Sequence, residues 1–262
     1  MRIPFYQIDA FTDKLFGGNP AGVCPLQAWF PSSVMQSIAA ENNLAETAFF
    51  VRKDDEIEIK WFTPLVEVDL CGHATLASAH VIFNHLGTDL DTLKFSSKSG
   101  ILKVSRRQGL ICLDFPADFC DPVDPPDGLI EAIGNEPIVC YKGKTDYMMI
   151  YPNEDDIKAL NPDFGKLAKV DARGVIVTAP GEEVDFVSRF FAPQVGVNED
   201  PVTGSAHTSL IPYWSRNLVK QEMTAKQLSK RGGELLVKMM GNRVEISGKA
   251  VTYLEGEIEV PD

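Results

Sequence analysis

Two stretches of this chain, half its length apart, repeat one pattern. Residues 62–79 read FTPLVEVDLCGHATLASA, and residues 191–209 read FAPQVGVNEDPVTGSAHTS. Each begins with Phe-x-Pro, passes acidic residues and reaches Gly-polar-Ala where a helix is expected to start. The two Gly-polar-Ala triplets begin at Gly72 and Gly204, which lie 132 residues apart in a chain of 262. The repeat predicts two similar domains that face each other, with a small-molecule site in the cleft between them.

Strand signals dominate the rest of the chain. Residues 56–62 alternate apolar and polar side chains, and Gly-Asn at residues 241–242 is typical of a hairpin turn. Helices are expected at residues 31–42, 74–86, 206–217 and 223–232. The apolar residues of segment 74–86 fall on every side of the helical wheel, which is typical of a buried helix. Pro212 is expected to kink or shorten the helix that contains it.

These signals predict an α+β fold of two pseudo-symmetric halves. Each half is expected to be a curved, mostly antiparallel, β-barrel-like sheet around a central buried helix. The proline-rich segment 115–127 is the best candidate for a linker. We place the N-terminal half at residues 1–117, with a C-terminal strand at about 251–262 as a candidate to complete it, and the C-terminal half at residues 118–250.

The composition excludes several classes of protein. The formal net charge is −12, which argues against nucleic acid and anionic membranes as partners. No window contains the 18 or more apolar residues of a membrane span, and the N-terminus lacks the apolar core of a signal peptide. The five cysteines are scattered, without a CxxC pair or a His/Cys cluster, so no structural zinc site is expected. A cytoplasmic location with reduced thiols is therefore expected.

The first candidate site is the segment DLCGHAT at residues 69–75. Gly72 lets the backbone approach a ligand closely, and the free N–H groups at the start of the following helix favour an anion. His73 would stand at the mouth of that site. A capping histidine is the competing interpretation, and the polar Ser205 at the duplicate position leaves the two about equal.

Two acidic segments offer candidate groups for proton transfer. Asp200 comes shortly before the second repeated helix and Ser205 lies at its start, and spacing alone slightly favours capping roles for both. Glu46 follows a helix end and enters an apolar strand, where desolvation would raise its pKa into the range useful for proton transfer. By composition alone a solvated loop glutamate is the more common outcome.

Two other kinds of site are disfavoured. A hydrolase triad can be composed from Ser205, His73 and Asp200, but the chain has no Gly-x-Ser-x-Gly elbow and Ser205 lies within a helix start. The glycine-rich segment 17–22 lacks the lysine of a phosphate-binding loop and any GxGxxG spacing, so a nucleotide site there is weak.

Four longer motifs are GNPAGV at residues 18–23, NLAETAF at 43–49, DLCGHAT at 69–75 and EDPVTGSAH at 199–207. In this order, and together with the ending SGKAVTYLEG at 247–256, they resemble the phenazine-biosynthesis PhzF-like isomerase family over nearly the whole chain. The resemblance implies the diaminopimelate-epimerase-like fold, which agrees with the internal repeat. It also implies proton-transfer chemistry without cofactor or metal, and a homodimer.

The resemblance also assigns roles to single residues. In the family the main acid–base residue is the glutamate of an Asn-Leu-Ser-Glu-Thr-like motif, which corresponds to Glu46, with alanine in place of the common serine. The supporting catalytic residues correspond to His73, Asp200 and Ser205. The substrate-binding residues expected beside them are Gly72, Gly204, Asn19 and Thr203.

An amino-acid racemase or epimerase of the same fold is the first alternative. Racemising relatives use two cysteines, one from each half, and Cys71 stands where one of these thiols would be. Adding the repeat offset leads to Thr203, so the second thiol is missing. A two-thiol mechanism is therefore disfavoured, and a small buried residue is the more common use of such a cysteine.

The function predicted from the sequence is a cofactor-independent isomerase. Glu46 would remove a proton from a small, cyclic or unsaturated carboxylic acid, and Glu46, Asp200 or His73 would return it elsewhere on the molecule. The helix starts at Gly72 and Gly204 would hold the substrate's oxygens. A protein that binds small molecules without turnover is the second alternative.

Overall fold

A computed structural model describes residues 1–53 and 56–261 of the chain. It divides into two compact units, each described by itself. The first unit comprises Met1–Asp114 and Ser247–Asp262, and the second comprises Phe115–Ile246. Among the described residues, no helix is long and apolar enough to cross a membrane.

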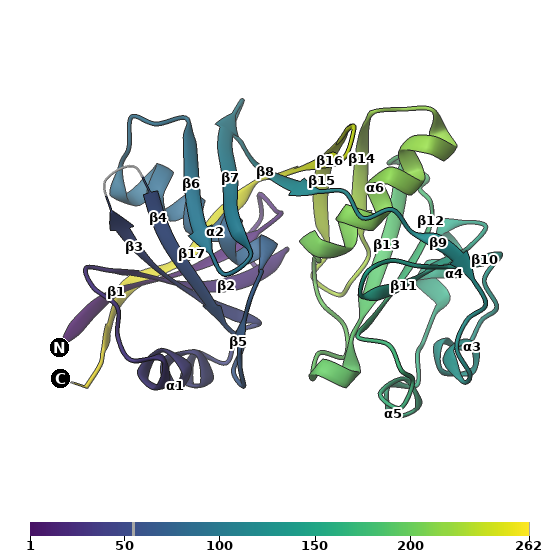
Figure 1. The fold of residues 1–262 in the computed structure, drawn as a ribbon, viewed down its shortest axis with the longest axis horizontal. Helices are drawn as coiled ribbons and strands as arrows, with labels where there is room; N and C mark the ends of the chain where they lie inside the picture. Colours follow the sequence, from purple (N-terminus) through teal and green to yellow (C-terminus); the bar gives the residue numbers. More distant parts are fainter. Residues whose placement is uncertain (54–55, 262) are drawn as a thin grey trace. The chain divides into compact units, whose positions relative to one another are not determined.

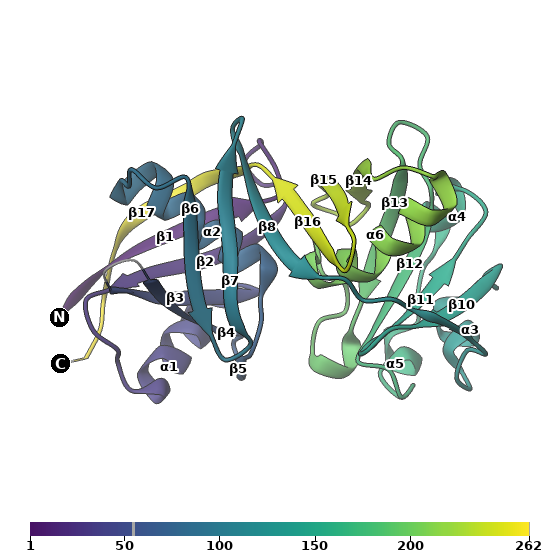
Figure 2. The same cartoon turned by 45° about the horizontal axis from the view of Figure 1, so that its top comes forward.

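The first unit is built mainly from strands (Figures 1 and 2). Its strands are β1 (Arg2–Ala10), β2 (Asn19–Leu26), β3 (Glu46–Lys53), β4 (Glu56–Phe62), β5 (Glu67–Val68), β6 (Thr92–Ser97), β7 (Gly100–Arg107), β8 (Leu110–Pro116) and β17 (Ala250–Glu259). Its helices are α1 (Ser32–Asn42), α2 (Gly72–Val81) and a π-helical turn, η1 (Ile82–Leu86), that continues α2.

The second unit has the same mixture of elements. Its strands are β9 (Asp121–Val123), β10 (Val139–Lys142), β11 (Asp146–Ile150), β12 (Gly174–Pro180), β13 (Phe186–Phe191), β14 (Glu222–Gln227), β15 (Gly233–Met240) and β16 (Arg243–Gly248). Its helices are α3 (Leu129–Ile133), α4 (Glu154–Ala159), α5 (Phe164–Leu167), the 3-10 turn η2 (Pro193–Val195) and α6 (Gly204–Leu218).

The two units arrange their strands in the same way. The first has the order β17-β1-β2-β3-β4-β6-β7-β8, and the second has the order β9-β10-β11-β12-β13-β14-β15-β16. In the first unit β2 pairs in parallel with β3 and β4 with β6; in the second β11 pairs in parallel with β12 and β13 with β14. The other pairs along each series that carry a register are antiparallel. The predicted α+β fold of two pseudo-symmetric halves is confirmed.

Each unit surrounds one central helix, inserted at the same point of the strand order. Helix α2 follows β4 and β5 and precedes β6, while α6 lies between β13 and β14 in the sequence. Every residue of α2 from His73 to Ala79 is buried, as its apolar wheel predicts. Helix α6 is buried on one side, where Leu210, Ile211 and Trp214 face the core. Burial of these apolar surfaces is the main force that holds each helix in place.

One expected helix is absent, and Pro212 does not shorten the helix that contains it. Residues 223–232 form no helix: Met223, Ala225 and Gln227 are buried at alternate positions of strand β14, which pairs with strands on both sides. Pro212 does not interrupt α6, which runs through it. The carbonyl that Pro212 leaves without a helical donor belongs to Thr208, and this oxygen accepts the backbone N–H of Asp118 at 3.0 Å.

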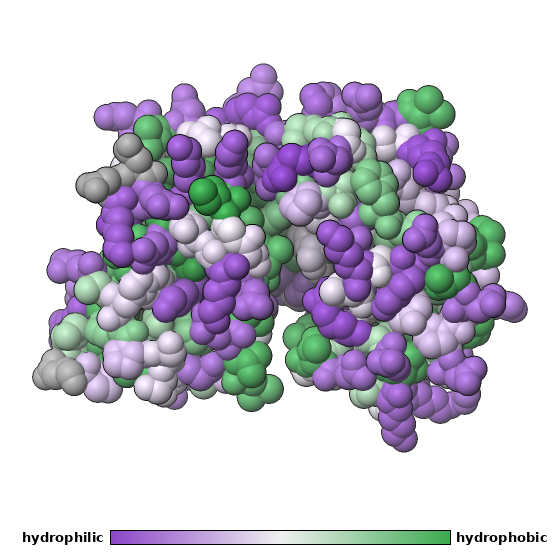
Figure 3. All heavy atoms as spheres, viewed as in Figure 1, coloured by the Kyte–Doolittle hydropathy of each residue, from purple (hydrophilic) through white to green (hydrophobic). Residues whose placement is uncertain are grey.

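The surface agrees with the acidic, charged composition. On the face shown in Figure 3, hydrophilic side chains cover most of each unit, and apolar side chains are scattered among them.

The turn between β15 and β16 contains Gly241 with a positive φ, as the predicted Gly-Asn hairpin requires. All five cysteines are free thiols, in agreement with the absence of a disulfide pattern in the sequence.

Gly174 is a glycine of the second unit at which a side chain is expected to be poorly tolerated. A Cβ atom there would lie 2.8 Å from Asp146 Oδ1 and would also overlap the Phe190 ring. We expect Gly174→Ala to lower the free energy of unfolding by about 1–3 kcal/mol, the usual result of overpacking. Chemical denaturation measures this change. The matched control is Gly256→Ala, since a Cβ at Gly256 meets no atom closer than 3.9 Å; equal stability losses in the two variants would contradict the prediction.

Candidate functional site

The first unit brings Asn19 and Glu46 to one edge of its sheet. They are the first residues of β2 and β3, which run in parallel with Ala21 paired to Glu46. Helix α2 begins nearby at Gly72, and its second residue is His73. The same unit therefore contains four residues that the sequence selected: Asn19, Glu46, Gly72 and His73. Asn19 and Glu46 lie beside the His73 ring.

The His73 imidazole is contacted on both nitrogens. Its Nε2 lies 3.3 Å from Glu46 Oε2, and its Nδ1 lies 3.3 Å from Asn19 Nδ2. Cys71 Sγ lies 3.5 Å from the same Nδ1. The His73 and Glu46 side chains are 6% and 20% exposed, so the histidine is enclosed and the carboxylate retains access to a ligand.

The state of the His73 proton follows from these contacts. Burial lowers the pKa of His73 to about 3, because the charged imidazolium would lose its hydration, so the ring is neutral at pH 7. The amide nitrogen of Asn19 can only donate, and the Cys71 thiol can also donate, so Nδ1 is the acceptor. The single ring proton is then on Nε2, which is buried and makes no hydrogen bond to the described residues, although Glu46 Oε2 lies 3.3 Å away. His73 does not cap its own helix, whose N-cap residue is Cys71.

Glu46, Cys71 and His73 are also the residues that could approach a metal ion. One ligand atom of each lies within 4.8 Å of the others. The thiol approaches Nδ1 and the carboxylate approaches Nε2, so the two candidate ligands lie nearest to different nitrogens of the ring. A histidine binds one ion through one nitrogen, so the side chains would have to shift for all three to bind the same ion.

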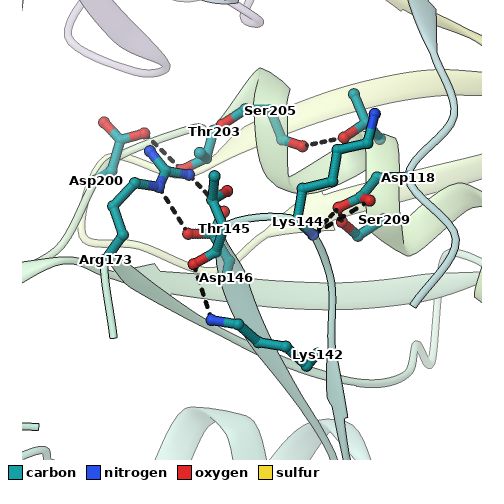
Figure 4. Close-up of polar contacts among 11 residues, drawn as sticks. Asp118, Lys142, Lys144, Thr145, Asp146, Arg173, Asp200, Thr203, Ser205 and Ser209 are labelled. Carbon is teal, nitrogen blue, oxygen red and sulfur yellow. Dashed lines mark hydrogen bonds and ion pairs between the residues drawn. The ribbon is translucent and has the colours of Figure 1, made fainter. Parts of the chain in front are cut away.

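The second unit gathers another set of predicted residues around Asp200 (Figure 4). Thr203 Oγ1 donates to Asp200 Oδ2 at 2.5 Å, and Thr203 is the N-cap residue of α6. The fully buried Gln227 accepts the Thr203 N–H at 2.9 Å and donates to the Asp200 carbonyl at 2.8 Å. These bonds fix the loop that carries Asp200. Ser205, the second residue of α6, is exposed to solvent.

The neighbouring acidic residue has a structural role. Glu199 accepts hydrogen bonds from Arg189 Nε at 2.7 Å and from Arg189 Nη2 at 3.1 Å. The same arginine donates through Nη1 to the carbonyls of Ile157 and Leu160. Glu199 is therefore held by this paired arginine, and Asp200 is the residue of the acidic pair that is held beside the start of α6.

Both central helices begin with Gly-polar-Ala and have no side-chain cap. Cys71 is the N-cap residue of α2 and Thr203 that of α6, and neither side chain accepts a hydrogen bond from its own helix. Amide groups of the first turn and the helix dipole favour a negatively charged oxygen at such a start. The equivalence of Cys71 and Thr203, expected from the repeat offset, holds in the structure. The second unit therefore offers a hydroxyl where the first offers a thiol.

Three residues of the second unit were missed by sequence reasoning. Gln227 supports Asp200 and Thr203, and Asp146 forms an ion pair with Arg173. Their partners lie 24 to 27 residues away along the chain, so no local pattern could indicate these pairs. The roles assigned to Glu46, His73, Asp200 and Ser205, and the single cleft expected from the repeat, stay predictions.

Comparisons with known proteins identify the relatives of this chain. Residues 8–256 match the family described as phenazine biosynthesis-like protein, PhzC-PhzF. An uncharacterized isomerase of Pseudomonas aeruginosa is 49% identical over 260 residues, which cover 99% of this chain and 100% of that protein. A crystal structure of a phenazine biosynthesis protein of the PhzF family from Enterococcus faecalis matches with a TM-score of 0.96 at 44% identity, over 99% of this chain and 100% of that one.

A more distant structure shares the fold alone. A hydroxyproline epimerase from Agrobacterium vitis has a TM-score of 0.67 at 10% identity, and the match covers 100% of this chain and 93% of that one. Together with the PhzF-family structure, this likeness confirms the epimerase-like fold that the sequence motifs implied.

We expect His73 to remain neutral, with its proton on Nε2, from pH 8 down to pH values near the lowered pKa of about 3. Nitrogen chemical shifts of the imidazole, followed by NMR across a pH titration, distinguish the two neutral tautomers from the charged ring. The spectrum of His73→Gln assigns the resonance. A midpoint near the ordinary histidine pKa of about 6.5, or a proton on Nδ1, would contradict the geometry.

Proposed function

The chain belongs to the phenazine biosynthesis-like PhzC-PhzF family, and we propose that it catalyses proton transfer on a small carboxylic acid without a cofactor, with Glu46 as the general acid and base. Relatives that share nearly its whole length are named isomerases, and the chain is an isomerase. The finer proposal is a double-bond shift or tautomerisation of a cyclic or unsaturated acid. No electrons leave or enter the substrate in such a reaction.

The observation that carries the proposal is the approach of Glu46 to the neutral ring of His73. The Nε2 nitrogen of His73 lies 3.3 Å from the Glu46 carboxylate, which in its ionised form is able to take a proton. Because the pKa of His73 is about 3, the ring competes poorly for that proton. Glu46 can therefore accept a proton from carbon and deliver it again within one catalytic cycle.

The remaining predicted residues have complementary tasks in this proposal. The uncapped starts of α2 and α6 offer backbone N–H groups to the oxygens of the substrate, where enolate charge develops as the proton leaves. Ser205 adds a hydroxyl at the start of α6. Asp200, fixed by Thr203 and Gln227, is the candidate to exchange a proton at a second carbon.

The alternatives differ in what they require of single residues. An epimerase of this fold with two thiols needs a second cysteine, and Thr203 occupies that position in the second unit. A binding protein without turnover needs no acid–base group, yet Glu46 is held against His73 in a nearly enclosed position. Both observations support the isomerase that uses Glu46.

We also propose that the enzyme works as a homodimer in the cytoplasm, with a carboxylic acid as its small-molecule partner. The family resemblance supports the dimer, and the five free thiols fit a reducing compartment.

Glu46→Gln is expected to remain folded and to lose about 10²–10⁴-fold in activity, the usual contribution of one acid–base group. The measurement is deuterium incorporation from D₂O into a panel of small cyclic and unsaturated carboxylic acids, followed by mass spectrometry. Glutamine keeps the shape of the side chain but removes its charge and its ability to carry the proton. Glu41→Gln is the matched control, because Glu41 is an exposed glutamate of the same unit. Full exchange by Glu46→Gln would exclude Glu46 as the base.

Cys71→Ala is expected to change the exchange rate by less than about tenfold, since the thiol contacts the acceptor side of His73 and a neutral ring contact contributes modestly. Treatment with a thiol-alkylating reagent provides a second test, with Cys71→Ala as the control for alkylation elsewhere. A loss as large as that of Glu46→Gln would indicate a thiol mechanism and favour the racemase alternative.

A further inference from the structure

Arg173 forms an ion pair at the sheet edge that carries the candidate residues of the second unit. It donates through Nε to Asp146 Oδ1 at 2.8 Å and through Nη2 to Asp146 Oδ2. Asp146 is buried, at 6% exposure, whereas the Arg173 side chain is 43% exposed. Figure 4 draws this pair together with Asp200, Thr203 and Ser205.

The topology places Arg173 at the same edge as Asp200. Strands β11 and β12 run in parallel and begin at this edge, with Asp146 paired to Gly174. Strand β13 runs antiparallel to β12 and ends there, and the Asp200 N–H donates to the Phe190 carbonyl of β13 at 3.1 Å. The Arg173 guanidinium lies over the ring of that same Phe190, 5.8 Å from its centroid.

The corresponding position in the first unit carries the general base. The repeated pattern begins with Phe62 in the first unit, which pairs with Thr47, and with Phe191 in the second, which pairs with Val175. The residue before Thr47 is Glu46, and the residue before Val175 is Gly174. Gly174 has no side chain, and the Asp146 carboxylate and Phe190 ring fill the space where its Cβ would lie. The second unit thus presents an arginine beside the place where the first presents a carboxylate.

The guanidinium retains a free edge. Asp146 takes the edge formed by Nε and Nη2, so one N–H of Nη2 and both N–H groups of Nη1 can donate to further partners. Among the described residues, no group accepts a hydrogen bond from Nη1. Two parallel N–H groups at the Nη1–Nη2 edge match the two oxygens of a carboxylate.

We propose that Arg173, oriented by Asp146, is the carboxylate-binding residue of the second unit and takes the acidic group of the substrate on its Nη1–Nη2 edge. The inference rests on the proposed function, because it takes its substrate from there. Its test by binding does not require the chemistry of Glu46. It makes the substrate a carboxylate that is recognised by a paired guanidinium as well as by helix starts. An ester or amide of the same acid lacks the charge that this edge recognises.

A purely structural role is the competing explanation, in which Arg173 only neutralises the buried Asp146. That role predicts lower stability in Arg173 variants, with no change in KM of the protein that remains folded. Arg173→Lys keeps a positive charge beside Asp146 but removes the planar edge. The double variant Asp146→Asn/Arg173→Gln leaves no buried unpaired charge. Arg216→Gln, an exposed arginine of the same unit, is the matched control for charge.

The first experiment measures binding in full-length Glu46→Gln protein, where turnover is blocked. Ligand-observed NMR titrations use 1-cyclohexene-1-carboxylate, its carboxamide and inorganic phosphate, with and without each Arg173 variant. We expect the carboxylate to bind in preference to the amide, and its Kd to rise about 10- to 100-fold in Arg173→Lys and in the double variant, the value of a charge-assisted hydrogen-bonded pair. Arg216→Gln should leave the Kd unchanged.

The second experiment measures deuterium exchange with the carboxylic acid that the wild-type enzyme labels best. Arg173→Lys should raise KM by a similar factor and leave kcat within about threefold, because the interaction is made in the ground state and transition state alike. Lower stability with unchanged KM would overturn the proposal. Equal binding of acid and amide, failure of the acid to bind at millimolar concentration, or Arg173-dependent binding of phosphate alone would also overturn it.

The two proposals fail separately. Carboxylate binding that depends on Arg173, without exchange by the wild-type enzyme, would support the binding residue and count against the isomerase chemistry. If exchange requires Glu46 but its KM is unchanged in Arg173→Lys, the result would support the isomerase chemistry and show that Arg173 does not bind the substrate.

Discussion

Burial of helix α2 inside its own sheet is the constraint on which the site of the first unit depends. The helix is apolar on every side, so the strands must surround it, and its second residue, His73, is enclosed with it. Enclosure removes water from the imidazole and keeps it neutral. A neutral ring with donors on Nδ1 has its proton on Nε2, 3.3 Å from Glu46 Oε2. The charge state of the histidine beside the candidate base is thus set by a packing requirement of the fold.

The two units show how one scaffold carries different chemistry. Their strand orders and the positions of their parallel pairs agree, and both central helices begin with the same Gly-polar-Ala pattern. The differences lie in single side chains at one sheet edge. Cysteine in one unit is replaced by Thr203 in the other, and the position of Glu46 is taken by Gly174. Repetition supplied two helix starts without side-chain caps, while divergence left one carboxylate beside a neutral histidine and the other beside a threonine.

The sequence alone was sufficient to predict the fold where a single segment carries a clear pattern. The repeat predicted the pseudo-symmetry, and the apolar wheel of segment 74–86 predicted a buried helix. Residues 223–232 were misread because lysine, glutamine and alanine favour a helix locally, whereas pairing with β13 and β15 determines the strand. Pro212 does not shorten α6, because a donor distant in the sequence, the Asp118 N–H, satisfies the Thr208 carbonyl. The same limit applies to the site: Glu46 and His73 stand in motifs, but Gln227, Asp146 and Arg173 act through partners that only the folded chain brings near.

A neutral histidine beside Glu46 is a group whose charge does not change near pH 7. An imidazolium at that position would attract the carboxylate more strongly, but it would cost more to bury. The neutral ring keeps the same charge across the physiological pH range, because the pKa of His73 is about 3. In the proposed reaction, titration of the ring would therefore not enter the pH dependence. One residue would carry the proton while its neighbour keeps a fixed charge, which suits a proton that must be returned to the same molecule.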